Sequence, residues 1–406
     1  MRNNLIVGQS GGPTAVINSS LAGVINRALT SEKVGKVYGM VNGIDGFLRE
    51  TIIELDRFRD DKKLKLLKQT PSSFLGSCRK KLPAINDDEQ IYRDIFALFD
   101  KYEIGYFLYI GGNDSMDTVS KLSQYAKLHN IDTTIIAGIP KTIDNDLVMT
   151  DHTPGYGSCA KFVANNIRQL ALDTGVYKMK SVVVAEIMGR NAGWLAASAA
   201  LANDEKIHPV DILLLPEVPF DADKFIERLK KVMEEKDSTI IAVSEGIKDK
   251  DGKYFGESGA TLMNDGFNHA QLGGVGKMIE ALIKDRLSIK TRSIEFSTLQ
   301  RCATNALSLI DVEEAFMAGF EGANHAIEGN TAFMAGFKRV SQNPYKCEVA
   351  FFDATKVANF EKEIPADMIG SDGMSMTEKF IEYAKPLVNG EPELLYNNGI
   401  VDFEIR

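Results

Sequence analysis

A lysine and two aspartates stand close together in the segment Pro-Lys-Thr-Ile-Asp-Asn-Asp, which follows an apolar run. They are Lys141, Asp144 and Asp146, within six residues of one another. A carboxylate can accept the proton of an attacking hydroxyl group, and a cation can stabilise the oxygens of a phosphoryl group during its transfer. An Asx-rich turn can have the same composition for purely structural reasons. The combination of charges nevertheless favours phosphoryl transfer to a hydroxyl.

A glycine-rich segment near the N-terminus, Gly-Gln-Ser-Gly-Gly-Pro-Thr, includes Gly11 and Gly12. Glycines allow backbone N–H groups to approach an anion closely. Pro13 fits the first turn of a helix, whose positive end would then face the loop. A phosphate-binding loop is therefore one interpretation of this segment, and a tight strand-to-helix turn without a ligand is an equally good one.

A second loop, Gly-Gly-Asn-Asp-Ser, contains Gly112, Asn113, Asp114 and Ser115. Its glycines could admit phosphate oxygens, and Asn113 or Asp114 could reach a metal ion. Asn, Asp and Ser are also the residues that most often cap helices. Taken by itself, this loop is better explained by capping.

The elements that must position these loops are short apolar runs, each of which leads through a glycine-bearing loop into a helical pattern. This alternation predicts an α/β protein with ligands at the carboxyl ends of its strands. We expect two Rossmann-like lobes with mostly parallel sheets: residues 1–150, with the donor site and the acidic segment, and residues 151–406, whose C-terminal segment could return to the first lobe. The predicted strands are Asn4–Val7, Tyr106–Ile110, Thr134–Gly138, Ser181–Ile187, Asp211–Leu215 and Thr239–Val243, and helices are expected from about Pro13, from about Ser115 and near Trp194.

The composition argues against several classes of partner. The chain has 406 residues and a formal charge of −9, which disfavours nucleic acid. No apolar run approaches the roughly 20 residues that cross a bilayer. The four cysteines are far apart and include no CxxC pair, so neither a zinc site nor a disulfide framework is indicated. We expect reduced thiols and a cytoplasmic protein.

From its first strand through at least Arg301, the chain resembles the phosphofructokinase family. The similarity lies in segments that follow the family's order: the two glycine loops, PKTIDND, the turn MGR at residues 188–190, a glutamate in AVSEG, and an arginine nine residues before a terminal LQR. Each segment alone is a weak or moderate indication, whereas all of them together are strong. The resemblance implies the family's fold and activity.

The resemblance also implies roles for individual residues of the first lobe. Asp144 would be the general base for the 1-hydroxyl of a sugar phosphate, and Asp146 would support the phosphoryl-transfer site. Thr142 and Ile143 would line the substrate. The residues that would bind the phosphoryl donor are Gly11, Gly12, Arg79, Gly112 and Ser115.

The sugar phosphate would be bound by Met188, Gly189, Arg190, Glu245, Arg292, Thr298 and Arg301. Glu245 would accept hydrogen bonds from sugar hydroxyls, and Arg292 and Arg301 would clamp the 6-phosphate. In the family, one arginine of this clamp comes from the neighbouring subunit. Arg292 fits that part, so the resemblance implies a homodimer or a homotetramer. Thr298 stands where a His or Tyr is more usual.

Three departures from the family pattern concern the phosphoryl donor and the metal. Asp114 replaces a small glycine of the ATP-dependent members, and Lys141 replaces another glycine. Both changes match the pyrophosphate-dependent branch, because Asp114 would repel the α-phosphate of a nucleotide and Lys141 would balance the charge of pyrophosphate. Asn113 stands where many relatives have an aspartate for Mg²⁺, and an amide is a weaker ligand for this ion.

The sequence therefore predicts magnesium-dependent phosphoryl transfer from pyrophosphate to fructose 6-phosphate, giving fructose 1,6-bisphosphate. An ATP-dependent enzyme of the same family is the nearest alternative, separated only by Asp114 and Lys141. A non-catalytic regulatory subunit of the same fold is a second alternative, and the intact Asp144, Asp146 and Arg190 argue against it.

Overall fold

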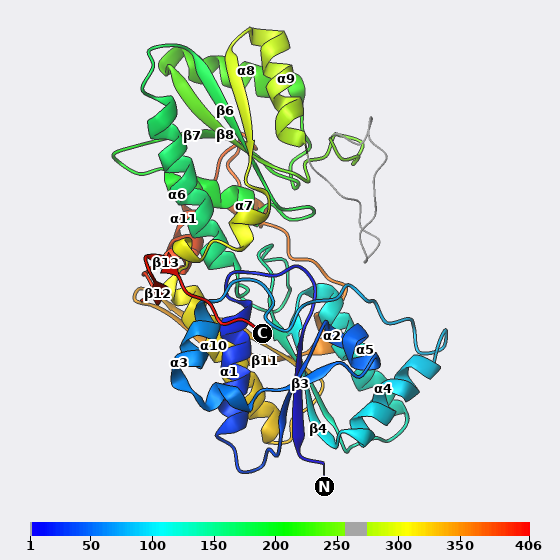
Figure 1. The fold of residues 1–406 in the computed structure, drawn as a ribbon. Coiled ribbons are helices and arrows are strands. Elements are labelled where there is room, and N and C mark those ends of the chain that lie inside the picture. Colours follow the sequence, from blue (N-terminus) through cyan, green and yellow to red (C-terminus); the bar gives the residue numbers. More distant parts are fainter. Residues whose placement is uncertain (1, 256–273) are drawn as a thin grey trace.

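The computed structural model describes residues 2–255 and 274–406, which form two lobes, each with a β-sheet flanked by helices (Figure 1). The elements around the first sheet are β1 (Asn4–Gln9), α1 (Ile17–Leu29), β2 (Val37–Met40), α2 (Gly43–Leu48), β3 (Ile52–Glu54), α3 (Asp61–Gln69), α4 (Gln90–Lys101), β4 (Ile104–Gly111), α5 (Asn113–Leu128), β5 (Ile135–Pro140), α10 (Leu309–Ile327), β10 (Phe333–Gln342) and β11 (Tyr345–Asp353). Those of the second lobe are α6 (Tyr156–Thr174), β6 (Ser181–Ile187), α7 (Trp194–Ala197), β7 (Val210–Leu214), α8 (Ala222–Glu235), β8 (Ser238–Ser244), α9 (Val275–Leu287), β9 (Lys290–Glu295) and α11 (Glu378–Ala384). A short hairpin near the C-terminus pairs β12 (Tyr396–Asn397) with β13 (Ile400–Val401).

The first sheet has the strand order β11-β10-β5-β4-β1-β2-β3. Its strands are parallel except at the two edges, where β3 runs antiparallel to β2 and β11 antiparallel to β10. In the centre, Gly8 lies beside Tyr109 and Tyr109 beside Gly138. Because the three central strands end at the same edge, the loops that follow β1, β4 and β5 meet there.

The second sheet has the order β7-β8-β6-β9, and its strands are all parallel. The central strands β6 and β8 are buried along almost their whole length, as expected for strands covered by helices on both faces. Their carboxyl ends carry the turn at residues 188–190 and Glu245. The predicted fold class, two lobes with mostly parallel sheets, is confirmed.

All six predicted strands are present, and none of their ends differs by more than two residues. The predicted start of the first helix, at about Pro13, is wrong. Helix α1 begins at Ile17, and residues 13–16 belong to the loop that precedes it. The helix near Trp194 is only four residues long and continues as a 3₁₀ helix, Ser198–Ala202. Among the described residues, we find no helix with the length and apolarity needed to cross a membrane.

The C-terminal third of the chain contacts both sheets. The hairpin of β10 and β11 extends the first sheet next to β5. The chain then passes to the second lobe, where Phe380 of α11 packs with Trp194 in the hydrophobic core. The last residues return to the first lobe, where Arg57 forms an ion pair with Glu404. Residues 354–406 therefore connect the two lobes, as the orange and red ribbon shows (Figure 1).

Helices α1 and α10 pack so closely where they cross that only glycine fits at the contact. A Cβ atom added to Gly319 would lie 1.9 Å from the carbonyl oxygen of Ser20, and one added to Gly23 would lie 2.1 Å from that of Phe316. Both obstacles are backbone atoms of the facing helix, so they cannot move aside alone. This contact fixes α1, and with it the glycine loop that precedes α1, against the rest of the first lobe.

We expect Gly319→Ala to lower the free energy of unfolding by about 1–3 kcal/mol, the usual cost of overpacking a core. The clash with the Ser20 carbonyl should outweigh the gain of about 1 kcal/mol in helix propensity. Gly322→Ala on the same helix is the matched control, because the atoms nearest to its added methyl group belong to side chains, Cδ1 of Ile139 at 2.3 Å and Cβ of Ala335 at 3.4 Å, and not to the backbone. Thermal unfolding followed by circular dichroism would measure both variants. Equal melting temperatures for the two would contradict this account of the helix crossing.

Candidate functional site

A cleft of about 640 Å³ lies between the two lobes, at the carboxyl ends of the central strands of both sheets. It brings together most of the residues that the sequence predicted for the site. Those in its lining are Gly11, Gly12, Arg79, Gly112, Asn113, Asp114, Ser115, Lys141, Thr142, Ile143, Asp144, Asp146, Met188, Arg190, Glu245 and Arg301.

Three predicted residues do not line this cleft. Gly189 lies behind it, where its backbone N–H donates to a carboxylate oxygen of Glu245 at 3.4 Å. Thr298 is exposed and outside the lining. Arg292 is exposed on β9 and borders a separate small hollow with Tyr177. Within one chain, the predicted pair of Arg292 and Arg301 is therefore not formed.

Lys141 connects the segment that carries Asp144 and Asp146 to the glycine-rich segment near the N-terminus. Its side chain is only 2% exposed, and its Nζ donates to the carbonyl oxygen of Gly12 at 2.6 Å. Burial lowers the pKa of Lys141 to about 8, although Asp144 and Asp146 both act in the opposite direction. Gly11 has a φ of 77° and lies so close to Lys141 that an added Cβ would be 3.4 Å from its Nζ. The glycine therefore serves both the turn and the approach of the cation.

Asp144 and Asp146 are both partly buried in the loop of residues 141–146, called here the acidic loop. Burial raises the pKa of Asp144, while the Thr142 hydroxyl, which donates to Asp144 Oδ2 at 3.3 Å, and the charge of Lys141 lower it. Burial and the charge of Asp144 raise the pKa of Asp146. Asp146 Oδ1 is buried and has no hydrogen-bond partner among the described residues. Such an atom favours a cation or a proton beside it.

Cations face the acidic loop from several directions. Burial and the nearby Arg79 lower the pKa of Arg301, whose guanidinium lies close to Gly12. Arg190 lies in the same cleft, and its Nε is buried without a hydrogen-bond partner among the described residues. Guanidinium groups gathered around an open space are suited to phosphate, which accepts paired hydrogen bonds from them. Burial also raises the pKa of Glu245, to about 7.

The N-terminus of α5 points into the cleft, but the capping interpretation of its first residues is wrong. Gly112 occupies the cap position, and no side chain caps the helix. The amide of Asn113 instead bonds to the backbone of Asn359 and Phe360. Asp114 forms an ion pair with Lys81 at 3.1 Å. The positive end of this 16-residue helix is thus available to an anion in the cleft.

Seven of the described residues that line the cleft were not among the predicted site residues: Pro13, Lys81, Asn191, Ala192, Asn359, Phe360 and Glu361. Asn191 and Ala192 directly follow the Met-Gly-Arg turn, so a wider window around that motif would have included them. Residues 359–361 belong to a segment with no motif at all. They reach the cleft only because the chain crosses there from one lobe to the other.

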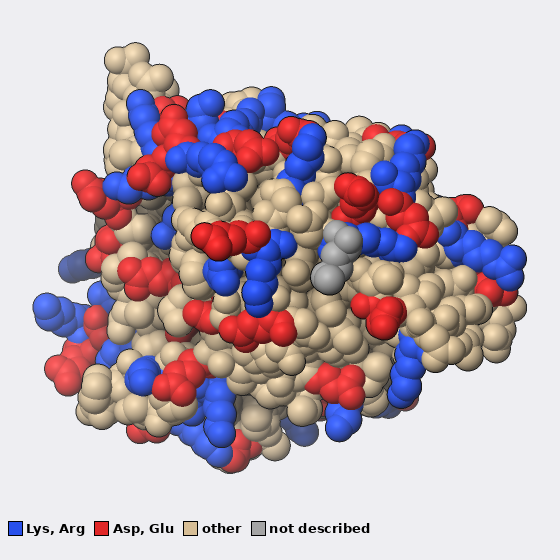
Figure 2. Space-filling model, turned by 90° about the horizontal axis from the view of Figure 1, so that it is seen from below, with Lys and Arg blue, Asp and Glu red and all other residues tan. Residues whose placement is uncertain are grey.

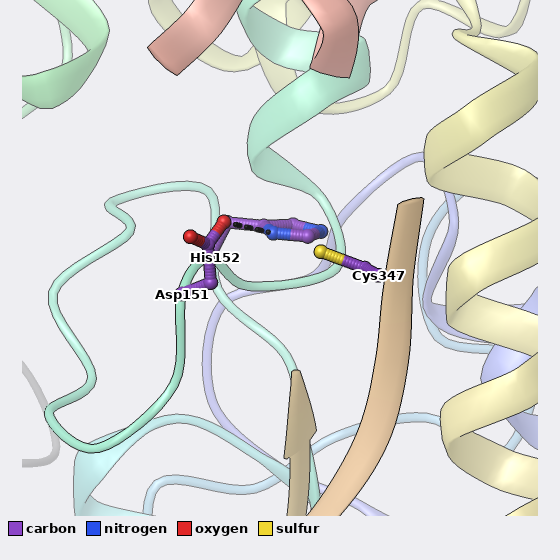
Figure 3. Close-up of side chains that lie close together, drawn as sticks. All are labelled: Asp151, His152 and Cys347. Atoms are coloured by element: carbon purple, nitrogen blue, oxygen red, sulfur yellow. Dashed lines mark hydrogen bonds and ion pairs between the residues drawn. The ribbon is translucent and has the colours of Figure 1, made fainter. Parts of the chain in front are cut away.

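Beneath the acidic loop lies a buried cluster with the chemistry of a metal site. Asp151, His152 and Cys347 have ligand atoms within 4.8 Å of one another (Figure 3). However, the His152 ring nitrogens already face Asp151 at 2.9 Å and Glu314 at 2.7 Å. Arg339 adds a second cation, 2.9 Å from the Asp151 carboxylate. A protonated imidazole and Arg339 balance the two carboxylates, so the cluster needs no metal ion to be neutral.

This cluster supports the acidic loop from below. Burial alone would lower the pKa of His152, but the charge of Glu314 and the hydrogen bond to Asp151 raise it well above the usual value. The Tyr383 hydroxyl donates to the Asp151 carbonyl at 2.9 Å and accepts from the amide of Asn145 at 2.8 Å. Asn145 stands between the two aspartates of the acidic loop. The network therefore holds the backbone from which both carboxylates project.

A raised pKa in the folded state makes the contribution of His152 to stability dependent on pH. This contribution is fully present below about pH 6.5, the value in an unfolded chain, and is lost as the pH rises through the folded value. We expect the stability of the wild type to fall with rising pH by up to about 1.4 kcal/mol per unit through this residue. His152→Gln should be less stable than the wild type near pH 6, and this difference should shrink at higher pH.

Urea unfolding of both proteins between pH 6 and 9 would measure this effect. His325→Gln is the control. Burial lowers the pKa of His325, so replacing this residue should not remove the fall of stability with rising pH. An identical pH slope in the wild type and His152→Gln would show that folding does not raise the pKa of His152.

Comparisons with known proteins agree with this geometry. The family model described as phosphofructokinase matches residues 4–315. A pyrophosphate–fructose 6-phosphate 1-phosphotransferase of Methylococcus capsulatus is 38% identical over 98% of this chain and 95% of its own length. One of Xanthomonas campestris is 40% identical over 97% and 94%. The crystal structure of a pyrophosphate-dependent phosphofructokinase from Nitrosospira multiformis superposes with a TM-score of 0.89 at 34% identity, covering 99% of this chain and 96% of that one. With its fold, its cleft and its sequence in agreement, the chain belongs to the phosphofructokinase family.

Proposed function

We propose that the chain transfers a phosphoryl group from pyrophosphate to the 1-hydroxyl of fructose 6-phosphate, giving fructose 1,6-bisphosphate and phosphate. This is a reversible step of glycolysis, placed here in the cytoplasm. The observation that carries the proposal is the buried Lys141, whose ammonium group stands between the glycine loop and the two carboxylates of the acidic loop. The names of the relatives in Methylococcus and Xanthomonas support the same reaction.

In this proposal Asp144 accepts the proton of the sugar 1-hydroxyl as the oxygen attacks the phosphorus atom. Its raised pKa makes it a stronger base than an exposed carboxylate, and the hydroxyl of Thr142 orients one of its oxygens. Lys141 and Arg79 stabilise the negative charge that spreads over the transferred group and the leaving phosphate. The N–H groups at the start of α5 and the glycine loop receive the remaining oxygens.

The sugar phosphate would lie against the second lobe. Arg190 and Arg301 would bind its phosphate, and Glu245 would accept hydrogen bonds from its hydroxyls. The backbone N–H of Gly189 donates to Glu245, which holds this carboxylate toward the cleft. Met188 completes the wall beside them. The 1-hydroxyl would then face Asp144 across the gap between the lobes.

The residues of the cleft fit Mg²⁺, which this reaction requires in our proposal. Asp146 offers a buried carboxylate oxygen without a hydrogen-bond partner among the described residues, and Asp144 lies beside it. Carboxylates are the protein ligands that this hard cation prefers. The amide of Asn113 is already engaged with residues 359 and 360, so we assign the metal to Asp146 rather than to Asn113. When bound, Mg²⁺ would supply positive charge that balances the charge of pyrophosphate.

We also propose that the active unit is a homodimer or a homotetramer. Arg292 lies outside the cleft of its own chain, beside a hollow that includes the exposed side chains of Tyr177 and Met179. Leu172 and Val176 on the same segment are each 67% exposed. An apolar surface next to an arginine is typical of a protein interface. A second subunit seated there would receive Arg292 in its sugar-phosphate site.

The choice of donor tests the proposed function directly. We expect purified wild type to use pyrophosphate in preference to ATP, as judged by kcat/KM with fructose 6-phosphate and magnesium. Asp114→Gly should shift the ratio of these values toward ATP, and Lys141→Gly should weaken the use of pyrophosphate more than that of ATP. The double variant should shift the ratio further than either change, because the two loops face one site.

Asp114→Asn is the matched control that separates the charge of Asp114 from its size. It keeps the volume of the side chain and removes the repulsion of the α-phosphate of a nucleotide. A preference of the wild type for ATP would contradict this proposal and favour the ATP-dependent alternative. A complete absence of turnover with every donor would instead favour the regulatory subunit.

Arg292→Ala tests the contribution across the subunit interface. It should raise the KM for fructose 6-phosphate at least tenfold and leave the KM for pyrophosphate nearly unchanged. Mixing it with an inactive Asp144→Asn variant should restore part of the activity, because one site of the hybrid dimer then has both residues. Arg286→Ala, which removes an exposed arginine paired with Asp223, is the control and should change neither KM. If subunits exchange but no activity returns, Arg292 does not act across the interface.

A further inference from the structure

Residues 359–362, called here the strap, belong to the segment that leads from β11, which ends at Asp353, to the second lobe (Figure 1). Three of them, Asn359, Phe360 and Glu361, line the cleft. They lie beyond residues 4–315, the part that matches the family model. The strap is therefore a feature of the site that the family's motifs do not explain.

The strap is attached to the donor side of the cleft at the start of α5. The amide of Asn113 donates to the Phe360 carbonyl and accepts from the Asn359 N–H. The side-chain amide of Asn359 donates to the carboxylate of Asp117 at 3.0 Å. These contacts lie on both sides of Asp114, the residue that we propose excludes nucleotides.

The other end of the strap is tied to the acidic loop and to the second lobe. The backbone N–H of Lys362 donates to the carbonyl oxygen of Asp146 at 2.7 Å. Glu361 accepts from the amide of Asn191 at 2.7 Å, and Trp194 Nε1 donates to the Lys362 carbonyl at 2.8 Å. The strap is thus held at both ends by direct hydrogen bonds, and it crosses the cleft as a fixed wall.

Two side chains of this wall oppose a long anionic ligand. Phe360 lines the cleft and is 58% exposed, so its side chain is not held in a core. Glu361 lines the same cleft, where its carboxylate accepts from the Asn191 amide at 2.7 Å. A phosphate chain that extended past the start of α5 would meet this bulk and this negative charge. Clashes and like charges are the means by which sites reject a wrong ligand.

We propose that the strap sets the length of the phosphoryl donor, through the bulk of Phe360 and the charge of Glu361, so that the site accepts two phosphates and rejects three. The proposal rests on the pyrophosphate-dependent function proposed above. It differs from the exclusion of a nucleoside by Asp114, because it applies equally to an inorganic chain of three phosphates. Tripolyphosphate, which has no nucleoside, is therefore the probe that isolates the strap.

The test compares tripolyphosphate with pyrophosphate in the wild type, Glu361→Gln and the double variant Phe360→Ala with Glu361→Gln. Inhibition by tripolyphosphate against pyrophosphate gives its inhibition constant. In the wild type this constant should exceed the KM for pyrophosphate at least tenfold. It should fall several-fold in the single variant and at least tenfold in the double variant, while the KM for pyrophosphate changes less than threefold.

Glu363→Gln is the matched control, because Glu363 is exposed, adjacent to the strap and outside the lining of the cleft. The inhibition constant of tripolyphosphate for Glu363→Gln should equal that for the wild type. Trp194 is the single tryptophan of the chain and bonds directly to the strap, so its fluorescence reports whether the strap keeps its place in each variant. The glutamine of Glu361→Gln can still accept from Asn191, so this variant remains a test if the double variant does not fold.

Equal inhibition constants in the wild type and both strap variants would overturn the proposal, as would a wild type that binds tripolyphosphate as tightly as pyrophosphate. Failure of the proposed function would have a different signature. It would be seen in the wild type alone, as a preference for ATP over pyrophosphate or as a lack of turnover.

Discussion

The partial burial of two carboxylates side by side is the constraint on which the rest of the site depends. Asp144 and Asp146 are both partly buried, and desolvation raises the pKa of each. Neither charge could persist there without cations, because desolvation and mutual repulsion act together. The buried Lys141 and the arginines of the cleft provide that compensation. The same positive charge is what a phosphate needs, so the interactions that stabilise the loop also prepare it for an anionic substrate.

The backbone of the acidic loop is fixed from two sides. Below it, Asn145 bonds to Tyr383, whose hydroxyl bonds to the backbone of Asp151 and thus to the His152 cluster. Above it, the Asp146 carbonyl accepts from Lys362 of the strap. A general base must be held within a fraction of an ångström of its substrate to be effective. Both supports come largely from the last quarter of the chain, which contacts the two lobes and so couples their positions to the loop.

Local sequence patterns were sufficient for most of the fold. The strands were recognisable because parallel strands covered on both faces are continuous apolar runs, and all six were found. The start of α1 was misplaced because Pro13 suits a first helical turn but does not require one. Capping of α5 was wrong because Asn113 bonds to residues 359 and 360, and no local rule can anticipate a partner so distant in the sequence.

The sequence by itself determined the chemistry of the site, because each motif carries its reacting groups within a few residues of a strand end. Lys141, Asp144 and Asp146 need only the turn that follows β5 to lie together. The tertiary structure alone decided which residues surround them. It placed Arg301 against Gly12, brought the strap across the cleft, and left Arg292 outside it. These positions depend on how two sheets and a returning C-terminal segment pack together, a long-range arrangement that no short spacing encodes.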